Sequence, residues 1–283
     1  MNNLLVNHNN QKKIALINDY SGFGRCSVAV QLPIISTMKV QCCPVPTSIF
    51  SNHTGFPQFY YQDYTEHMEK YLEMWDMLGL KFSGISSGFL GSSRQIDIVT
   101  NFIKNADNNP IVVIDPVMGD YGKLYPTYTE EMCNDMVRLV SLADVVTPNL
   151  TEACILTGTD YHEQWKMADL LELAKRVSDI GAKKVVITGI PQKSFVCNFC
   201  YDATQEEVNT SMIKTHRVGT SRSGTGDIFS AIVVADAVNG VSFDVSVRKA
   251  SSFIKKCIIK AIEMDIPLTD GVPFEEVLDK LKA

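Results

Sequence analysis

Short apolar runs alternate along this chain with longer segments in which hydrophobic residues recur every three or four positions. The alternation is typical of an α/β fold, in which helices cover a mostly parallel sheet. The predicted strands span residues 13–18, 40–46, 84–87, 111–114, 144–147 and 185–188, with antiparallel strands at 193–201 and 211–217. The predicted helices span residues 27–37, 65–77, 94–104, 130–142 and 165–180, and others begin at Asn149, Gly226 and Phe243.

No linker, repeat or low-complexity tract interrupts this pattern. We therefore expect one domain over residues 1–283, with residues 1–11 as a polar N-terminal extension.

Charge and hydropathy exclude several classes of protein. The net charge of -6 and the pI near 5.4 argue against nucleic-acid binding and against a basic membrane-surface protein. No stretch approaches the roughly 18 apolar residues of a membrane span. The N-terminus is polar and rich in Asn, without the apolar core of a secretory signal, so the expected location is the cytoplasm.

The eight cysteines are scattered through apolar segments, which is typical of small buried residues and not of a disulfide framework. Cys197 and Cys200 have the spacing of a zinc-binding pair, but no second pair accompanies them and their segment is a predicted strand. We therefore expect no zinc site.

Polar residues follow several of the predicted strands directly. In open α/β sheets the ligand binds at the carboxyl ends of the parallel strands, so these residues are the ones to examine. They are residues 18–19, 47–55, 115–120, 147–149 and 188–189.

The run Ser223-Gly-Thr-Gly-Asp227 precedes a strongly apolar helix. Its glycines permit a tight turn and leave N–H groups uncovered at the positive end of that helix, which suits a phosphate anion. Asp227 is then placed to act as a general base on an alcohol that attacks phosphorus. The alternative is that Asp227 only caps the helix.

Two further acidic motifs follow strands. Asp115 and Asp120 flank a turn-rich loop, where a carboxylate near phosphates could hold Mg²⁺, or where Asp115 could simply start the turn before Pro116. Asn149 and Glu152 have the spacing of a capping box, and Glu152 could instead reach Mg²⁺ through water. Both alternatives stay open for each motif.

A polar cluster, Ser51-Asn-His-Thr-Gly55, follows the second strand. Its imidazole, amide and hydroxyl groups could bind the edge of a small polar ring, or form a solvated turn.

Taken in order, these motifs together with Gly22-Phe-Gly24 and Thr188 resemble the pyridoxal kinase family of the ribokinase-like superfamily, from about Ile14 to Lys260. The resemblance implies a three-layer fold without the lid sheet of sugar kinases. It also implies phosphorylation of the 5′-hydroxymethyl group of pyridoxal, pyridoxine or pyridoxamine by ATP with Mg²⁺ and often K⁺, in a homodimer.

The resemblance also implies roles for single residues. Asp227 matches the catalytic base, and the anion hole is matched by Gly224, Thr225 and Gly226. The polar groups around Mg²⁺ and the phosphates are matched by Asp115, Asn149 and Glu152, with Asp115 and Glu152 as the metal-side acids. Nucleotide-side contacts are matched by Thr147 and Thr188. The candidate vitamin-side residues are Asp19, Ser51, His53, Thr54 and Gly55.

The chain departs from the better-known pyridoxal kinases, which carry Ser near the ring nitrogen where this chain has Asp19. The region around Cys26 resembles the shorter-loop subgroup called pyridoxamine kinase, which leaves the choice of vitamer open. Arg222, before the anion hole, is expected to face solvent, with a phosphate contact as the alternative.

Two other functions are alternatives. One is a kinase for hydroxymethylpyrimidine or a sugar. Asp227 in place of a Cys argues against the pyrimidine kinase, and the 51–55 cluster in place of a Gly-rich sugar loop argues against a sugar kinase. A non-catalytic vitamin- or nucleotide-binding homologue has against it the intact acidic and amide residues.

Overall fold

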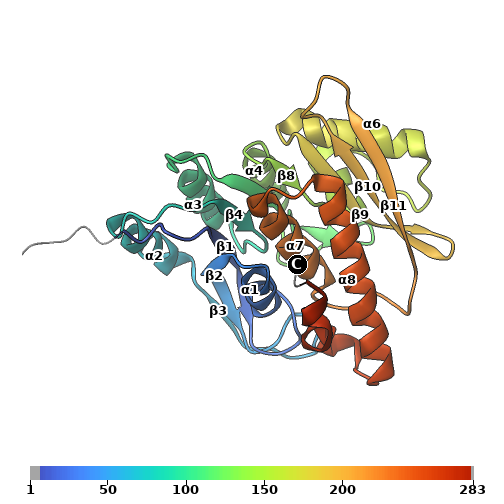
Figure 1. Cartoon of the computed structure of the whole chain (residues 1–283), viewed down its shortest axis with the longest axis horizontal. Coiled ribbons are helices and arrows are strands. Elements are labelled where there is room, and N and C mark those ends of the chain that lie inside the picture. Colours follow the sequence, from blue (N-terminus) through green and yellow to red (C-terminus); the bar gives the residue numbers. More distant parts are fainter. Residues whose placement is uncertain (1–6, 282–283) are drawn as a thin grey trace, which may run out of the picture.

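A nine-stranded sheet runs through residues 7–281, the part of the chain that the computed structural model describes (Figure 1). Its strand order is β11-β10-β9-β8-β5-β4-β1-β2-β3. The neighbours from β2 to β9 run parallel, and antiparallel strands extend the sheet at both edges. The strands are β1 (Lys13–Ser21), β2 (Gln41–Phe50), β3 (Tyr61–Asp63), β4 (Gly84–Ser87), β5 (Ile111–Ile114), β8 (Val145–Val146), β9 (Lys184–Gln192), β10 (Phe195–Asp202) and β11 (Asn209–His216).

Helices cover both faces of this sheet. In β1, Ile14 and Leu16 face one hydrophobic core while Ala15 and Ile17 face the other, because side chains alternate along a strand. Helices α1, α7 and α8 pack on the first face, nearest the viewer in Figure 1, and α2 to α6 pack on the second. The helices are α1 (Val28–Thr37), α2 (Thr65–Met77), α3 (Ser93–Lys104), α4 (Glu130–Val140), α5 (Leu150–Thr157), α6 (Met167–Ile180), α7 (Thr225–Asn239) and α8 (Phe243–Glu263). The expected α/β architecture is confirmed.

The main differences from the prediction lie in short elements. Strand β2 continues to Phe50 although it contains Pro44 and Pro46. These prolines break no bond on the outer side of β2, since β3 pairs with β2 only at residues 48–50 and the earlier part of β2 is a sheet edge. Strand β3 and the hairpin β6–β7 (Gly119–Asp120 and Lys123–Leu124) were not predicted, because two or three residues carry no periodicity.

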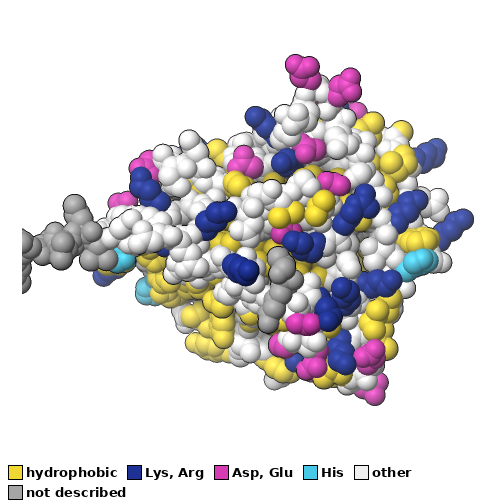
Figure 2. All heavy atoms as spheres, in the orientation of Figure 1, with side chains coloured by type: hydrophobic (Ala, Val, Ile, Leu, Met, Phe, Trp, Pro, Cys, Tyr) yellow, Lys and Arg dark blue, Asp and Glu magenta, His cyan; other side chains and the backbone are white. Residues whose placement is uncertain are grey.

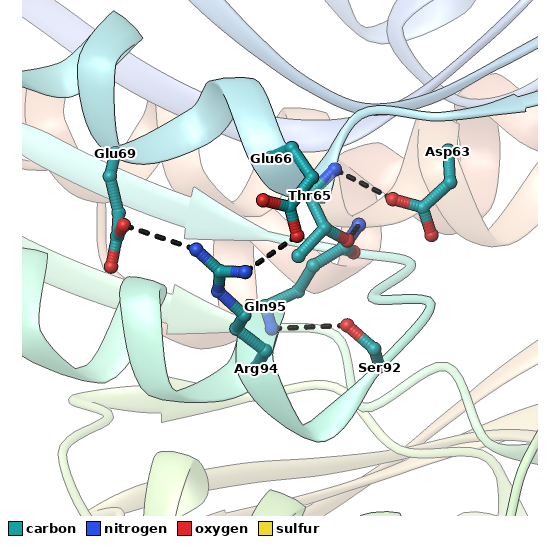
Figure 3. Close-up of polar contacts among 7 residues, drawn as sticks. All are labelled: Asp63, Thr65, Glu66, Glu69, Ser92, Arg94 and Gln95. Atoms are coloured by element: carbon teal, nitrogen blue, oxygen red, sulfur yellow. Dashed lines mark hydrogen bonds and ion pairs between the residues drawn. The ribbon is translucent and has the colours of Figure 1, made fainter.

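Polar contacts join α2 to α3 (Figure 3). The buried Gln95 amide donates to the carbonyl oxygen of Thr47 at 2.9 Å and to the Thr65 hydroxyl at 2.8 Å. Arg94 forms exposed ion pairs with Glu66 and Glu69 across the same two helices. Of these, the buried Gln95 contacts matter more, because exposed ion pairs contribute little stability.

The C-terminal segment packs beside α1 and α8 as two 3₁₀ helices, η1 (Leu268–Asp270) and η2 (Phe274–Leu281). Phe274 and Leu281 are buried in the same core as α7. Arg25 binds Glu275 at 3.0 Å and donates to the carbonyl oxygen of Asp270, which holds this segment against the loop after β1. The sequence pattern did not predict this segment.

Cys197 and Cys200 lie on opposite faces of β10, one in each core. Their side chains therefore point away from each other and do not form a metal-binding pair. All eight cysteines are free. Within residues 7–281, none of the helices has the length and apolar character needed to cross a membrane.

Candidate active site

A cleft of about 1360 Å³ opens at the carboxyl ends of the parallel strands. It brings together nearly all of the predicted site residues, although they come from distant parts of the chain. The predicted residues that line it are Asp19, His53, Thr54, Gly55, Asp115, Thr147, Asn149, Glu152, Thr188, Gly224, Thr225, Gly226 and Asp227. The exception is Ser51, which lies outside the lining; its hydroxyl bonds Asn52 and the Tyr60 N–H within the β2–β3 loop.

The glycine-rich turn forms the start of α7, one residue earlier than predicted. Gly224 has φ +78°, and a Cβ there would lie 1.9 Å from the carbonyl oxygen of Arg25. Only glycine fits this position, because both the conformation and the space exclude a side chain. The turn is therefore pressed against the loop after β1, with the N–H groups of the first turn of α7 at the cleft.

Asp227 lies in the first turn of α7, but its carboxylate bonds partners outside that helix. Oδ2 accepts the N–H of Ser27 at 2.8 Å, and Oδ1 accepts an N–H of the Asn18 side chain at 3.0 Å. Ser27 has φ +55°, a conformation that non-glycine residues rarely adopt and that often marks functional sites. Burial raises the pKa of Asp227 to about 6.

Asp115 and Glu152 add two more carboxylates to the same cleft. Burial and the charge of Asp227 raise the pKa of Asp115 to about 7. Burial and the charge of Asp115 raise the pKa of Glu152 well above its usual value. In the described part of the chain, none of these acids has a Lys or Arg ion-pair partner.

This uncompensated charge suits a divalent cation with oxygen ligands. Within residues 7–281, no group of three or more His, Cys, Asp or Glu side chains is arranged to hold a metal ion alone. The donor set therefore fits Mg²⁺, which keeps waters and shares phosphate oxygens, better than a fully protein-bound metal.

Asn149 and Glu152 form the capping box of α5 and also line the cleft. Glu152 Oε1 accepts the N–H of Met118 at 3.3 Å, and the Asn149 amide donates to the carbonyl oxygen of Gly119 at 2.8 Å. The capping role predicted for the pair is confirmed. The same contacts tie the loop after β5 to the start of α5.

The loop that contains His53 lines one end of the cleft. His53 Nε2 lies 2.7 Å from the carbonyl oxygen of Thr269, and Nδ1 accepts the N–H of Gly55 at 3.0 Å. A carbonyl can only accept, so this geometry assigns the neutral ring with its proton on Nε2. Phe50, Phe59 and Phe89 line this end, so it presents aromatic faces beside polar groups.

Asp19 is buried where this end of the cleft meets the loop after β1. Its oxygens accept the hydroxyls of Ser27 at 2.6 Å and Ser21 at 3.1 Å. Burial raises its pKa. Asp19 therefore shapes the loop that donates to Asp227.

The end of the cleft beside Thr188 is lined by Asn198, Lys255 and Ile258. Asn198 accepts the N–H of Gly189 and donates to Ser251, so β9, β10 and α8 meet there. Lys and Arg side chains gather along α8 on the face shown in Figure 2, in a chain of net charge -6. Among the Lys and Arg residues of α8, Lys255 lines the cleft, where an anionic ligand would meet it.

The environment of the Arg222 side chain differs from the prediction. Its Nη1 donates to the carbonyl oxygens of Ile266, Pro267 and Gly271 at 2.8 to 3.3 Å. The expectation that it faces solvent is wrong, because the C-terminal segment covers it. Leu268 and Thr269 of that segment line the cleft, and no sequence motif marked them.

The sequence matches the family described as phosphomethylpyrimidine kinase over residues 30–268. It is 33% identical over 201 residues to a pyridoxine kinase of Bacillus subtilis (strain 168), covering 69% of each chain. It is 31% identical over 179 residues to a hydroxymethylpyrimidine/phosphomethylpyrimidine kinase of Staphylococcus aureus (strain MRSA252), covering 62% of each.

A solved structure from Bacteroides thetaiotaomicron VPI-5482, provisionally named a phosphomethylpyrimidine kinase, is similar over nearly the whole chain. Its orthorhombic form, which is described as containing pyridoxal, has a TM-score of 0.92 at 35% identity, with 96% of each chain covered.

Proposed function

The chain belongs to the phosphomethylpyrimidine kinase family, and from this premise we propose that it phosphorylates the 5′-hydroxymethyl group of vitamin B6 with ATP. The acceptors are pyridoxal, pyridoxine and pyridoxamine, and the product is the 5′-phosphate. The pyridoxine kinase relative and the similar structure with pyridoxal support this acceptor class.

One observation carries the proposal. Asp227 lies between the glycine-rich turn and the polar, aromatic end of the same cleft, and two N–H donors orient its carboxylate. A base in that position can contact a primary alcohol while a phosphoryl group rests on the N–H groups of the turn.

In the proposed mechanism, the hydroxymethyl oxygen attacks the γ-phosphorus of ATP and Asp227 takes the proton of that hydroxyl. The new O–P bond forms as the bond to the β-phosphate oxygen breaks, and ADP leaves with that oxygen. The N–H groups of residues 224–227 and the dipole of α7 offset charge on the transferring oxygens. The protein thus contributes mainly positioning and charge stabilisation.

Asp115 and Glu152 are the proposed residues on the Mg²⁺ side, with Glu152 acting through water because both of its oxygens already accept N–H bonds. When bound, Mg²⁺ offsets the negative charge of the phosphates. We also propose K⁺ as an activator, on the family resemblance alone. Turnover with K⁺ replaced by a larger organic cation tests that requirement.

A second candidate acceptor is hydroxymethylpyrimidine. The family match and the Staphylococcus aureus relative favour it, and an aromatic ring with a hydroxymethyl group suits the same end of the cleft. The deciding experiment is ADP release over the three vitamers, hydroxymethylpyrimidine and ribose under identical conditions. The highest kcat/KM with a vitamer supports the proposal, and the highest with hydroxymethylpyrimidine replaces it. If none of these acceptors gives ADP release, the result favours the non-catalytic alternative.

We propose a homodimer in the cytoplasm. The edge strand β3 and its neighbours expose Ile49, Tyr60 and Tyr61, an apolar edge that a second subunit would cover. Eight free cysteines suit a reducing compartment. Light scattering of the purified chain tests the dimer, and a molar mass of one subunit at assay concentration contradicts it.

A further inference from the structure

A buried ring of hydrogen bonds starts at the Asp227 carboxylate and returns to the Asp227 backbone. Asn18, at the carboxyl-terminal part of β1, donates from Nδ2 to Asp227 Oδ1 at 3.0 Å and to Gln31 Oε1 at 2.8 Å. Gln31, in α1, donates from Nε2 to the Ser230 hydroxyl at 3.1 Å. That hydroxyl donates to the carbonyl oxygen of Asp227 at 3.2 Å. Asn18, Gln31 and Ser230 are each 1% exposed.

The hydrogen bonds of this ring can run in only one donor-to-acceptor direction. The Asn18 oxygen accepts the N–H groups of Asp19 at 2.9 Å and Phe89 at 2.8 Å, so its NH₂ group must face Gln31 and Asp227. Because Gln31 accepts from Asn18 through Oε1, its own NH₂ group must face Ser230. Each amide is thus fixed in one orientation, and a rotated amide would leave buried donors unpaired.

Asn18 also connects the strands beneath the cleft to Asp227, the proposed general base. Its bond to Phe89 connects β1 to the segment after β4, and its bond to Gln31 connects β1 to α1. Gln31 does not line the cleft, and its side chain bonds Asn18 and Ser230. A role in the reaction would therefore act through the orientation of Asp227.

We propose that Gln31 is a positioning residue for phosphoryl transfer, which acts through Asn18 to hold the Asp227 carboxylate toward the acceptor hydroxyl. This rests on the proposed function of Asp227 as the base. Removal of Gln31 leaves Asn18 Nδ2 with one acceptor in place of two, so the NH₂ group loses its support on the α1 side and holds the Asp227 carboxylate less firmly. The expected result is a lower kcat with little change in KM, since neither substrate is contacted.

The test compares Gln31→Met with Gln95→Met. Both residues are buried glutamines, 1% and 0% exposed, that bond backbone or side-chain groups. Gln95 lies in α3 and holds the end of β2, outside the ring. We expect Gln31→Met to lower kcat about 10-fold with both KM values within about 2-fold, against the 10²–10⁴ that a whole general base contributes. Gln95→Met is expected to lower the melting temperature similarly but to keep kcat.

A double-mutant cycle with Asn18→Ala shows whether Gln31 acts through Asn18. Gln31→Met in that background is expected to change kcat by less than about 2-fold, because the link it supports is already gone. If Gln31→Met does not fold, Gln31→Glu tests the same point. Buried and protonated, Glu accepts from Asn18 and donates to Ser230, so it is expected to keep most of the wild-type kcat.

The outcomes separate this inference from the proposed function. An active wild type in which Gln31→Met keeps kcat, or in which its effect adds fully to that of Asn18→Ala, overturns the inference alone. A Gln31→Glu variant that folds with a kcat as low as that of Asn18→Ala does the same. An inactive wild type, or a fully active Asp227→Asn, overturns the proposed function and the inference together.

Discussion

Asn149 and Glu152 cap each other at the start of α5: Asn149 Oδ1 accepts the Glu152 N–H at 3.0 Å, and Glu152 Oε2 accepts the Asn149 N–H at 2.8 Å. A cap alone needs no carboxylate, because Gln fills the same position in capping boxes. Yet Glu152 is 4% exposed and lies near Asp115, whose charge helps to raise its pKa. The acid is therefore held in place against electrostatic repulsion, which favours a role for its charge in the cleft.

Glu152→Gln separates the two roles. The amide keeps the bond to Asn149, gives up the longer bond from the Met118 N–H at 3.3 Å and removes the charge, so the melting temperature should fall by only a few degrees. The concentration of Mg²⁺ needed for half-maximal activity should rise about 10- to 100-fold, as for other residues that act on a metal through water. Steady-state assays over a Mg²⁺ series measure this.

The matched control is Asp169→Asn, the same acid-to-amide change at a helix start, where Asp169 accepts the N–H of Lys166 at 3.0 Å at the beginning of α6 and outside the cleft lining. It should leave the Mg²⁺ dependence unchanged. Equal Mg²⁺ curves for Glu152→Gln and wild type would show that Glu152 is a cap and nothing more.

Asp227→Asn should lower kcat by about 10²–10⁴, the usual contribution of a general base. Asn keeps an oxygen for Ser27 or Asn18, so the fold and ATP binding should change little. Rapid-quench kinetics with a calorimetric measurement of ATP affinity distinguishes loss of chemistry from loss of binding. Near-normal turnover in the variant refutes the assignment of Asp227 as the base.

The pH dependence of kcat/KM should report the same group. Asp227 must be charged to take a proton, and burial raises its pKa to about 6, so activity should fall as pH drops through about 6. An ordinary Asp would keep the enzyme active down to about pH 4. The titratable groups that face Asp227 are Asp19, His53 and Asp115, and the charge of Asp19 raises the pKa of Asp227 further. Full activity at about pH 4.5 would contradict this prediction.

Short motifs and the ends of strands predict much of the cleft. The start of α7 follows from Gly224 and the apolar run behind it, and the α5 cap follows from the spacing of Asn149 and Glu152. Because parallel strands end at one edge of a sheet, residues 115, 149 and 188 were expected to share a crevice, and they line one cleft.

Contacts between distant segments could not be predicted in this way. In the sequence, Gln31 cannot be distinguished from other polar residues of a helix. Its role depends on Ser230, which becomes its neighbour only because α1 packs on α7. Arg222 was expected in solvent because the segment that covers it, residues 266–271, has no periodicity and no motif. Ser51 sits in a promising cluster, but its hydroxyl completes the β2–β3 loop and not the cleft.

Mg²⁺ should stabilise the protein more at high pH than at low pH. Asp115, Glu152 and Asp227 have pKa values raised in the folded state, so between about pH 4 and pH 7 the folded protein binds more protons than the unfolded chain. The contribution of these groups to the free energy of unfolding is therefore fully present at about pH 4 and is lost as the pH rises through about 6 and about 7. A cation among the charged acids offsets this loss.

Melting temperatures at about pH 5 and about pH 8, with and without Mg²⁺ at constant ionic strength, measure this difference. The Mg²⁺-dependent increase should be larger at pH 8, and it should shrink in Glu152→Gln. An equal increase at both pH values would mean that Mg²⁺ binds elsewhere.

His53→Gln should raise the KM for the acceptor while KM for ATP and kcat stay near wild type. The ring joins the β2–β3 loop to the C-terminal segment through Thr269 and orders Gly55 through Nδ1. Gln replaces at most one of these bonds, and one net hydrogen bond is worth about 0.5–1.5 kcal/mol, or about 2- to 10-fold in affinity. His67→Gln, an exposed histidine on α2, is the control and should match wild type. A change confined to the KM for ATP would place this loop at the nucleotide end of the cleft, against the arrangement proposed above.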